Sequence, residues 1–172
     1  MTKTCAIIGG SPLCFPWGFD EEDEGCAALK LLLFHWITRL RGEGCARFAV
    51  SMDCGAGLYA AELLQGLRET DRALAAVFCV PHEEQATKWT PALRDRYFAA
   101  LAASTEVISI ARRKTVDCAF RAHLEAMREA DTVLAVYDPE DPRCAREAAA
   151  VAVAEMLGKR VLVLAPGAIR PA

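Results

Sequence analysis

The sequence predicts an α/β fold with a doubly wound, mostly parallel sheet that carries helices on both faces. Short apolar runs alternate with helical patterns from end to end of the 172 residues. The apolar runs are nearly continuous, which is typical of parallel strands covered on both faces. Strands that alternate with helices require right-handed crossovers, and these place helices over the sheet. Because the length suits one buried core, we expect a single domain over residues 1–172.

Six strands and five helices are expected in alternation. The strands are predicted at 4–9, 47–52, 73–80, 105–110, 132–137 and 160–165. The helices are predicted at 24–42, 56–69, 91–103, 115–130 and 143–158. The first helix follows an acidic run at 20–24, which suits a helix N-terminus and is interpreted as a solvated cap. The last helix is rich in alanine and ends at Gly158, a good C-terminal cap.

Composition narrows the classes of partner. A net charge of −3 gives no basic footprint, so nucleic acid is not an expected partner. The eight cysteines form no C-x-x-C pair, and with three histidines they predict no metal site. Several lie in apolar runs and are expected to be small buried hydrophobic residues. The most apolar stretch, 29–40, is too short for a membrane span, and no signal segment is recognised. We therefore expect a cytoplasmic protein without membrane association.

The loop after the first strand has two interpretations. Ligands of doubly wound sheets bind beyond the carboxyl ends of the strands, where the strand order reverses. Gly9, Gly10, Ser11 and Pro12 follow the first strand, and backbone N–H groups beside glycine can approach an anion closely. The same four residues are ordinary turn residues, and Pro12 interrupts the dinucleotide fingerprint. A phosphate cradle and a simple turn both remain open.

The loop at 52–57 opens the second helix and is also ambiguous. Gly55 and Gly57 would let backbone amides at the start of the helix face an anion. Asp53 could cap the helix or accept a hydrogen bond from a ribose hydroxyl group.

Two further loops carry candidate ligand groups. Within 81–90, Trp89 could stack on a base or cover an apolar seam, and His82 is expected to be a surface residue. Within 111–115, Arg112 and Arg113 could bind a phosphate, or they could belong to a solvated turn. The loop at 138–143 contributes three carboxylates and is expected to repel anions.

Four segments together resemble a known family. They are TCAIIGGSPLCFPWGFDEEDEGC, FAVSMDCGAGLYAAELLQGLRE, AVFCVPHEEQATKW with RDRYFAALA, and ADTVLAVYDPE. They are similar to the YpsA-like family of the SLOG superfamily, over about residues 4–165. The resemblance implies a single Rossmann-like SLOG domain, related to the lysine-decarboxylase-like phosphoribohydrolases. It further implies a nucleotide or a nucleotide-derived ligand.

The chain departs from the family pattern at several polar positions. The family's Gly-His-Arg-Pro is replaced by Gly9–Pro12, and its Arg-Asn by Ala122-His123. Met52 and Gly57 stand where the family has a glycine and an acid, and Glu140–Pro142 replaces a Gly-Gly-Thr turn. The cluster Arg112-Arg113-Lys114 is the candidate replacement for the missing charge. The pattern is kept at Pro81, Gln85, Trp89, Tyr97, Phe98, Asp138 and Glu147.

The resemblance and the loops together predict a domain that binds a nucleotide or a derivative such as ADP-ribose or NAD, as a sensor or regulator. The predicted ligand-binding residues are Gly9, Gly10, Ser11, Pro12, Asp53, Gly55, Gln85, Trp89, Arg112, Arg113 and Asp138. One alternative is a divergent paralogue that has lost its ligand and acts as a homodimer or through a protein partner. Another is a nucleotide N-glycosidic hydrolase, although the Pro-Gly-Gly-x-Gly-Thr-x-x-Glu motif is absent. No catalytic residue is predicted.

Overall fold

The structure is a computed structural model that describes residues 2–169. It contains one six-stranded sheet in which every neighbouring pair is parallel, with the strand order β4-β3-β2-β1-β5-β6. The strands are β1 (Lys3–Gly9), β2 (Cys45–Ser51), β3 (Ala75–Val80), β4 (Glu106–Ser109), β5 (Thr132–Val136) and β6 (Arg160–Leu164). The helices are α1 (Glu24–Gly42), α2 (Ala56–Thr70), α3 (Pro91–Ala102), α4 (Cys118–Met127) and α5 (Ala145–Met156). The predicted doubly wound, Rossmann-like α/β fold is confirmed.

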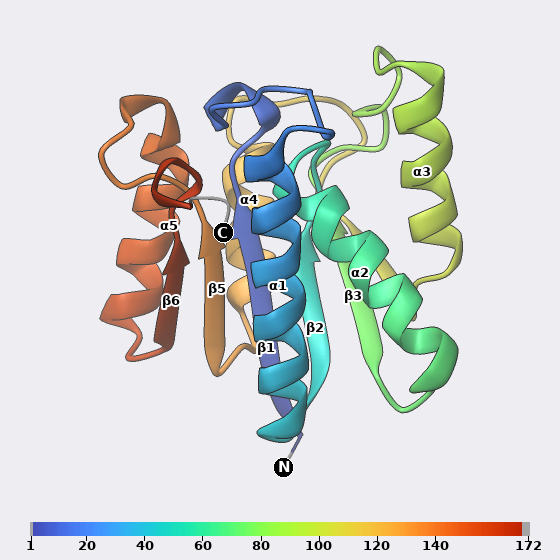
Figure 1. Cartoon of the computed structure of the whole chain (residues 1–172), viewed down its shortest axis with the longest axis vertical. Coiled ribbons are helices and arrows are strands. Elements are labelled where there is room, and N and C mark those ends of the chain that lie inside the picture. Colours follow the sequence, from blue (N-terminus) through green and yellow to red (C-terminus); the bar gives the residue numbers. More distant parts are fainter. Residues whose placement is uncertain (1, 170–172) are drawn as a thin grey trace.

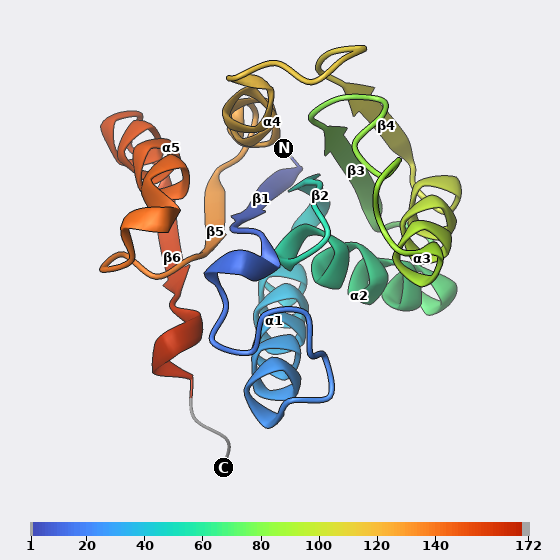
Figure 2. The same cartoon turned by 90° about the horizontal axis from the view of Figure 1, so that it is seen from above.

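The helices form two layers on the sheet (Figures 1 and 2). Helices α1, α2 and α3 pack on one face, and α4 and α5 pack on the other. The chain moves from β1 outward to the edge strand β4, and α4 then returns across the sheet to β5. The strand order therefore reverses between β1 and β5, which is where a ligand of such a sheet is expected.

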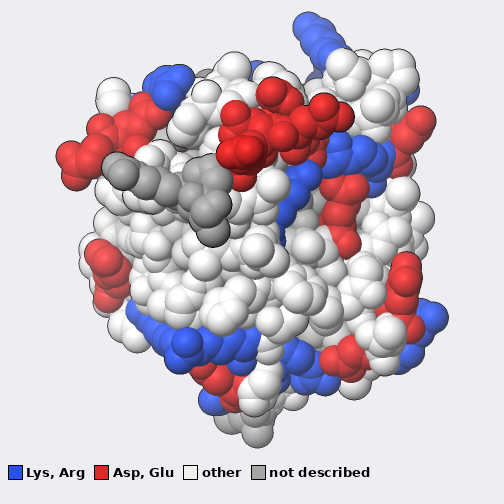
Figure 3. Space-filling view, viewed as in Figure 1, with Lys and Arg blue, Asp and Glu red and all other residues white. Residues whose placement is uncertain are grey.

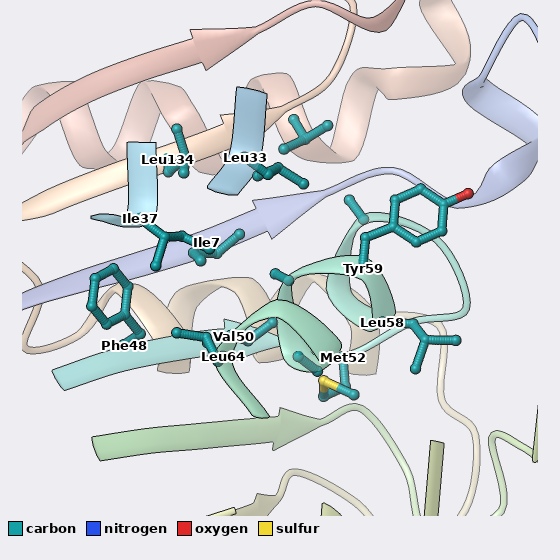
Figure 4. Packing of buried hydrophobic residues seen from close by; sticks show 14 of the residues in the cluster. Ile7, Leu33, Ile37, Phe48, Val50, Met52, Leu58, Tyr59, Leu64 and Leu134 are labelled. Carbon is teal, nitrogen blue, oxygen red and sulfur yellow. The ribbon is translucent and has the colours of Figure 1, made fainter. Parts of the chain in front are cut away.

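Residues that follow one another along β1 and β2 pack on opposite faces of the sheet. Ile7 and Phe48 belong to the apolar core under α1 and α2, shown in Figure 4. Ile8 and Ala49 belong to the second core, under α4 and α5. Because both faces are covered, both sets must be apolar, which explains the continuous apolar runs. Six of the eight cysteines are buried, and all eight are free thiols.

The acidic run before α1 does more than cap the helix. Asp23 is the N-cap, and its carboxylate accepts the Gly25 N–H at 2.7 Å. Glu21 instead forms ion pairs with Lys30 and Arg96, both at 2.6 Å. Figure 3 shows this group of acidic side chains beside lysine and arginine side chains near the start of α1. The prediction of a purely solvated cap is therefore wrong for Glu21, which ties this connection to α3.

Two predicted helices are shorter than expected. The helix predicted from residue 115 begins at Cys118, because Thr115 donates a hydrogen bond to the Asp117 carboxylate at 2.9 Å within a turn. The helix predicted from residue 143 follows a 3₁₀ turn at Pro142–Cys144, in which the Asp141 carboxylate accepts the Arg143 N–H at 2.9 Å. Among residues 2–169, no helix has the length and apolar character that a membrane crossing requires.

Candidate functional site

A cavity of about 250 Å³ lies at the carboxyl edge of the sheet. Its walls come from the connections that follow β1, β2, β3 and β4 and from the first turns of α4 and α5. It therefore occupies the edge at which the strand ends converge, on the side of the sheet covered by α4 and α5. This is the region in which doubly wound sheets hold their ligands.

Two cationic side chains at this cavity are available to a ligand. Lys114 and Arg146 line it, and neither forms an ion pair with another residue of the described chain. His82 also lines the cavity, and its Nδ1 is buried with no hydrogen-bond partner in residues 2–169. Burial and the neighbouring Lys114 ammonium lower the pKa of His82, which favours the neutral imidazole. A neutral ring can donate or accept one hydrogen bond to a ligand.

The N-terminus of α4 adds backbone donors to the same cavity. Its N-cap, Asp117, makes no side-chain hydrogen bond to the first turn. The N–H groups of Cys118 and Ala119 have no acceptor within the described residues, and both residues line the cavity. Free N–H groups and the positive end of the helix dipole together attract anions. Lys114 lies just before this helix, so its positive charge adds to that of the N-terminal end of the helix dipole.

The N-terminus of α2, by contrast, is already occupied by a side chain of the protein. The Asp53 carboxylate accepts the N–H groups of Gly55 at 2.8 Å and Gly57 at 2.9 Å. Gly55 is the N-cap residue by position, and the Asp53 side chain binds the N–H groups at the start of the helix, as the capping interpretation expects. Burial raises the pKa of Asp53 to about 7, although the two N–H donors act in the opposite direction.

We expect this carboxyl group to make stability pH-dependent. Its pKa in the folded state lies above the unfolded value of about 3.9, so the folded state holds the extra proton between about pH 4 and pH 7. The free energy of unfolding should therefore fall as the pH rises through that window. Asp53→Asn keeps an oxygen acceptor for the two N–H groups and cannot ionise. The stability of this variant relative to wild type should thus increase from about pH 5 to pH 8, as measured by urea unfolding. Parallel pH profiles of the two proteins would contradict this.

Gly9 and Gly55 allow a close contact between the first loop and α2. A Cβ atom on Gly9 would lie 2.5 Å from Cβ of Ala56, the first residue of α2. A Cβ atom on Gly55 would lie 2.9 Å from Cδ of Pro12 and 3.0 Å from the carbonyl oxygen of Gly10. The absence of these Cβ atoms lets the first loop and α2 pack directly against each other.

The structure brings only part of the predicted site together. Gly9, Ser11, Asp53 and Gln85 line the cavity. The other predicted ligand residues do not line it: Gly10, Pro12, Gly55, Trp89, Arg112, Arg113 and Asp138.

The structure shows where four of these outlying residues lie instead. Trp89 packs edge to face on Tyr97 of α3, with ring centroids 5.1 Å apart, so it covers an apolar seam. Arg112 and Arg113 line a separate depression. The Asp138 carboxylate accepts the Glu140 N–H at 3.0 Å and closes its own turn. The expectation that Trp89 and the two arginines share a pocket with the first loop is therefore wrong.

Several side chains at the cavity were not among the predicted ligand residues. A hydrogen-bonded chain links Ser51 at the end of β2, His123 of α4 and Glu147 of α5. Glu147 keeps the family pattern, which was a usable signal for it and for the adjacent Arg146. His123 replaces the family residue at its position, so the resemblance gave no reason to select it.

Comparison with known proteins identifies the family to which this chain belongs. The model of the YpsA family, described as the YspA SLOG family, matches residues 11–158. The chain is similar to the UPF0398 protein BH1768 of Halalkalibacterium halodurans, with 29% identity over 126 residues, 72% of this chain and 67% of that protein. It is also similar to the UPF0398 protein BLi02355/BL05236 of Bacillus licheniformis, with 31% identity over 112 residues, 64% of this chain and 60% of that protein. Because the family match covers most of its length, this chain belongs to the YpsA family of SLOG proteins.

Proposed function

We propose that this protein binds a small phosphorylated ligand, a nucleoside monophosphate, in the cavity at the carboxyl edge of the sheet. The observation that carries the proposal is the group of unpaired donors among the residues that line that cavity. The free N–H groups at the start of α4 and the cations of Lys114 and Arg146 all border it. This combination is suited to a phosphate dianion.

The size and the walls of the cavity favour a mononucleotide over a dinucleotide. Its volume of about 250 Å³ lies just under the usual range for ligand pockets, roughly 300–1,000 Å³. NAD or ADP-ribose would extend beyond it. Met52, Pro81 and Val116 also line the cavity and offer apolar surface to a base or a sugar. The family resemblance supports the same class of ligand, with a sensing or regulatory role.

Thermal unfolding against a ligand panel tests this proposal. A ligand at 100 times its dissociation constant should stabilise the fold by about 2.7 kcal/mol. For a domain of this size, we expect a rise in melting temperature on the order of 5–10 °C. The panel contains nucleoside monophosphates, ribose 5-phosphate, ADP-ribose and NAD, with unphosphorylated nucleosides as the matched control.

Monophosphates should give the shift, and the nucleosides should give none. Equal shifts with and without the phosphate would reject the phosphate site. No shift at millimolar concentration of any compound would favour the alternative, a protein-interaction module. Free base released in the same samples would instead indicate an N-glycosidic hydrolase.

A further inference from the structure

Three buried polar side chains at the cavity form a chain that phosphate binding does not require. The Ser51 hydroxyl lies 2.7 Å from Nδ1 of His123, and Nε2 of His123 lies 3.1 Å from Oε1 of Glu147. The three residues are 2%, 4% and 3% exposed, and all line the cavity. They come from β2, α4 and α5, so three separate elements converge on this contact.

Few other polar side chains are buried in the described part of the molecule. Among residues 2–169, the buried polar or charged side chains are Thr4, Ser51, His123 and Glu147. Three of these four therefore meet at one point beside a cavity. Burying a carboxylate and an imidazole together is costly, and apolar side chains could join α4 and α5 without that cost. The arrangement of hydroxyl, base and carboxylate is the one that activates a serine nucleophile.

We propose that Ser51, His123 and Glu147 hydrolyse a small carboxylic ester that carries a phosphate group. Ser51 is the nucleophile, His123 the general base, and Glu147 a positioning residue that holds the imidazole. The phosphate part of this substrate class rests on the proposed function, because Lys114, Arg146 and the start of α4 would hold it. The acyl transfer itself is assigned to the three linked side chains and does not need the phosphate contacts.

The reaction proceeds in two steps. The Ser51 oxygen adds to the ester carbonyl carbon while its proton passes to Nδ1 of His123. The Nε2–H group donates to Glu147, which stabilises the imidazolium. The tetrahedral intermediate then expels the alcohol, which takes the proton from His123 and leaves an acyl group on Ser51. Water attacks that acyl group with His123 again as base, releasing the carboxylic acid and restoring the serine hydroxyl.

The orientation of the ring differs from that in the serine proteases, where Nε2 faces the nucleophile. Here Nδ1 faces Ser51. A neutral imidazole carries its proton on either nitrogen, and the hydrogen bond at one nitrogen decides the state of the other. With Glu147 as acceptor at Nε2, the proton is held there and Nδ1 is free to accept from the serine.

Covalent labelling of the full chain with a fluorophosphonate tests the nucleophile directly. We expect one label, mapped to Ser51 by mass spectrometry, and complete loss of it in Ser51→Ala. Ser109→Ala is the matched control, because Ser109 is an exposed serine at the end of the edge strand β4 and does not line the cavity. That control should label as wild type does. An unlabelled wild type, or equal labelling of Ser51→Ala, would overturn the proposal.

Hydrolysis of a nitrophenyl ester tests the other two residues. His123→Asn, which replaces the base by an amide, should lower kcat by roughly 10²–10⁴-fold. Glu147→Gln should lower kcat while KM stays unchanged, and Glu147→Asp should recover part of the loss, because it restores the carboxylate. A purely structural role would give Gln and Asp variants that share wild-type kcat once folded, as checked by circular dichroism, and this would overturn the assignment of Glu147.

Each of the two proposals can be rejected without rejecting the other. Calorimetric titration with a nucleoside monophosphate measures the phosphate site without any ester. Labelling of Ser51 without monophosphate binding would retain the nucleophile and reject the phosphorylated substrate class. Binding without labelling or ester cleavage would reject the nucleophile and retain the proposed function.

Discussion

A Gly9→Ala variant is expected to lose about 2–3 kcal/mol of folding free energy. The added Cβ would lie 2.5 Å from Cβ of Ala56 and 2.9 Å from the carbonyl oxygen of Val136. Neither neighbour can yield by rotating a side chain, because one is the Cβ of the first residue of α2 and the other belongs to the backbone of β5. The start of α2 or the central strand pair would have to move. Urea unfolding monitored by circular dichroism measures the loss.

Gly66→Ala provides the matched control for this substitution. Gly66 lies inside α2, and a Cβ built there meets no atom within 4 Å. Alanine is the better helix former by roughly 0.5–1 kcal/mol, so this variant should be slightly more stable than wild type. The same substitution of glycine by alanine should thus destabilise the protein at position 9 and stabilise it at position 66. Equal stability of the two variants would show that the contact between α2 and β1 is looser than the structure indicates.

The second large effect concerns ligand affinity. Replacing both Lys114 and Arg146 by alanine is expected to weaken binding of a nucleoside monophosphate by roughly 10²–10⁴-fold, because each substitution removes a hydrogen bond to a charged group, worth on the order of 1.5–3 kcal/mol. Isothermal titration calorimetry measures the change.

The control for this pair removes the same formal charge outside the cavity. Arg112→Ala with Arg113→Ala deletes two cations that line a separate depression. Because neither arginine lines the cavity, neither can bond a phosphate held there, and the second pair should bind within a few fold of wild type. If the Arg112 and Arg113 pair caused the larger loss, the phosphate would have to lie in that depression and not in the cavity.

The fold could be predicted from the sequence because its signals are local. Continuous apolar runs marked the buried strands, and α1 begins and ends at the residues that the pattern indicated. The start of α4 was missed by three residues, since the hydrogen bond between Thr115 and Asp117 holds those residues in a turn. A helical hydrophobic pattern does not record such competition between side chain and backbone.

The candidate site was harder to predict because it depends on contacts between distant residues. Ser51 and His123 are separated by 72 positions, and His123 and Glu147 by 24. The two candidate residues of the polar loop at 81–90 lie in different places: Gln85 lines the cavity, whereas Trp89 packs on Tyr97. The residues of the basic cluster Arg112-Arg113-Lys114 likewise lie in different places. It follows β4 at the edge of the sheet, so only Lys114, nearest to α4, returns to the cavity.

A crystal structure of the full chain with bound adenosine monophosphate tests the central claim most directly. We expect the phosphate oxygens to lie within hydrogen-bond distance of the Cys118 and Ala119 N–H groups, with the side chains of Lys114 and Arg146 turned toward them. A phosphate at the start of α2, where the Asp53 carboxylate would have to be displaced, would contradict the claim. A phosphate held by Arg112 and Arg113 would contradict it equally.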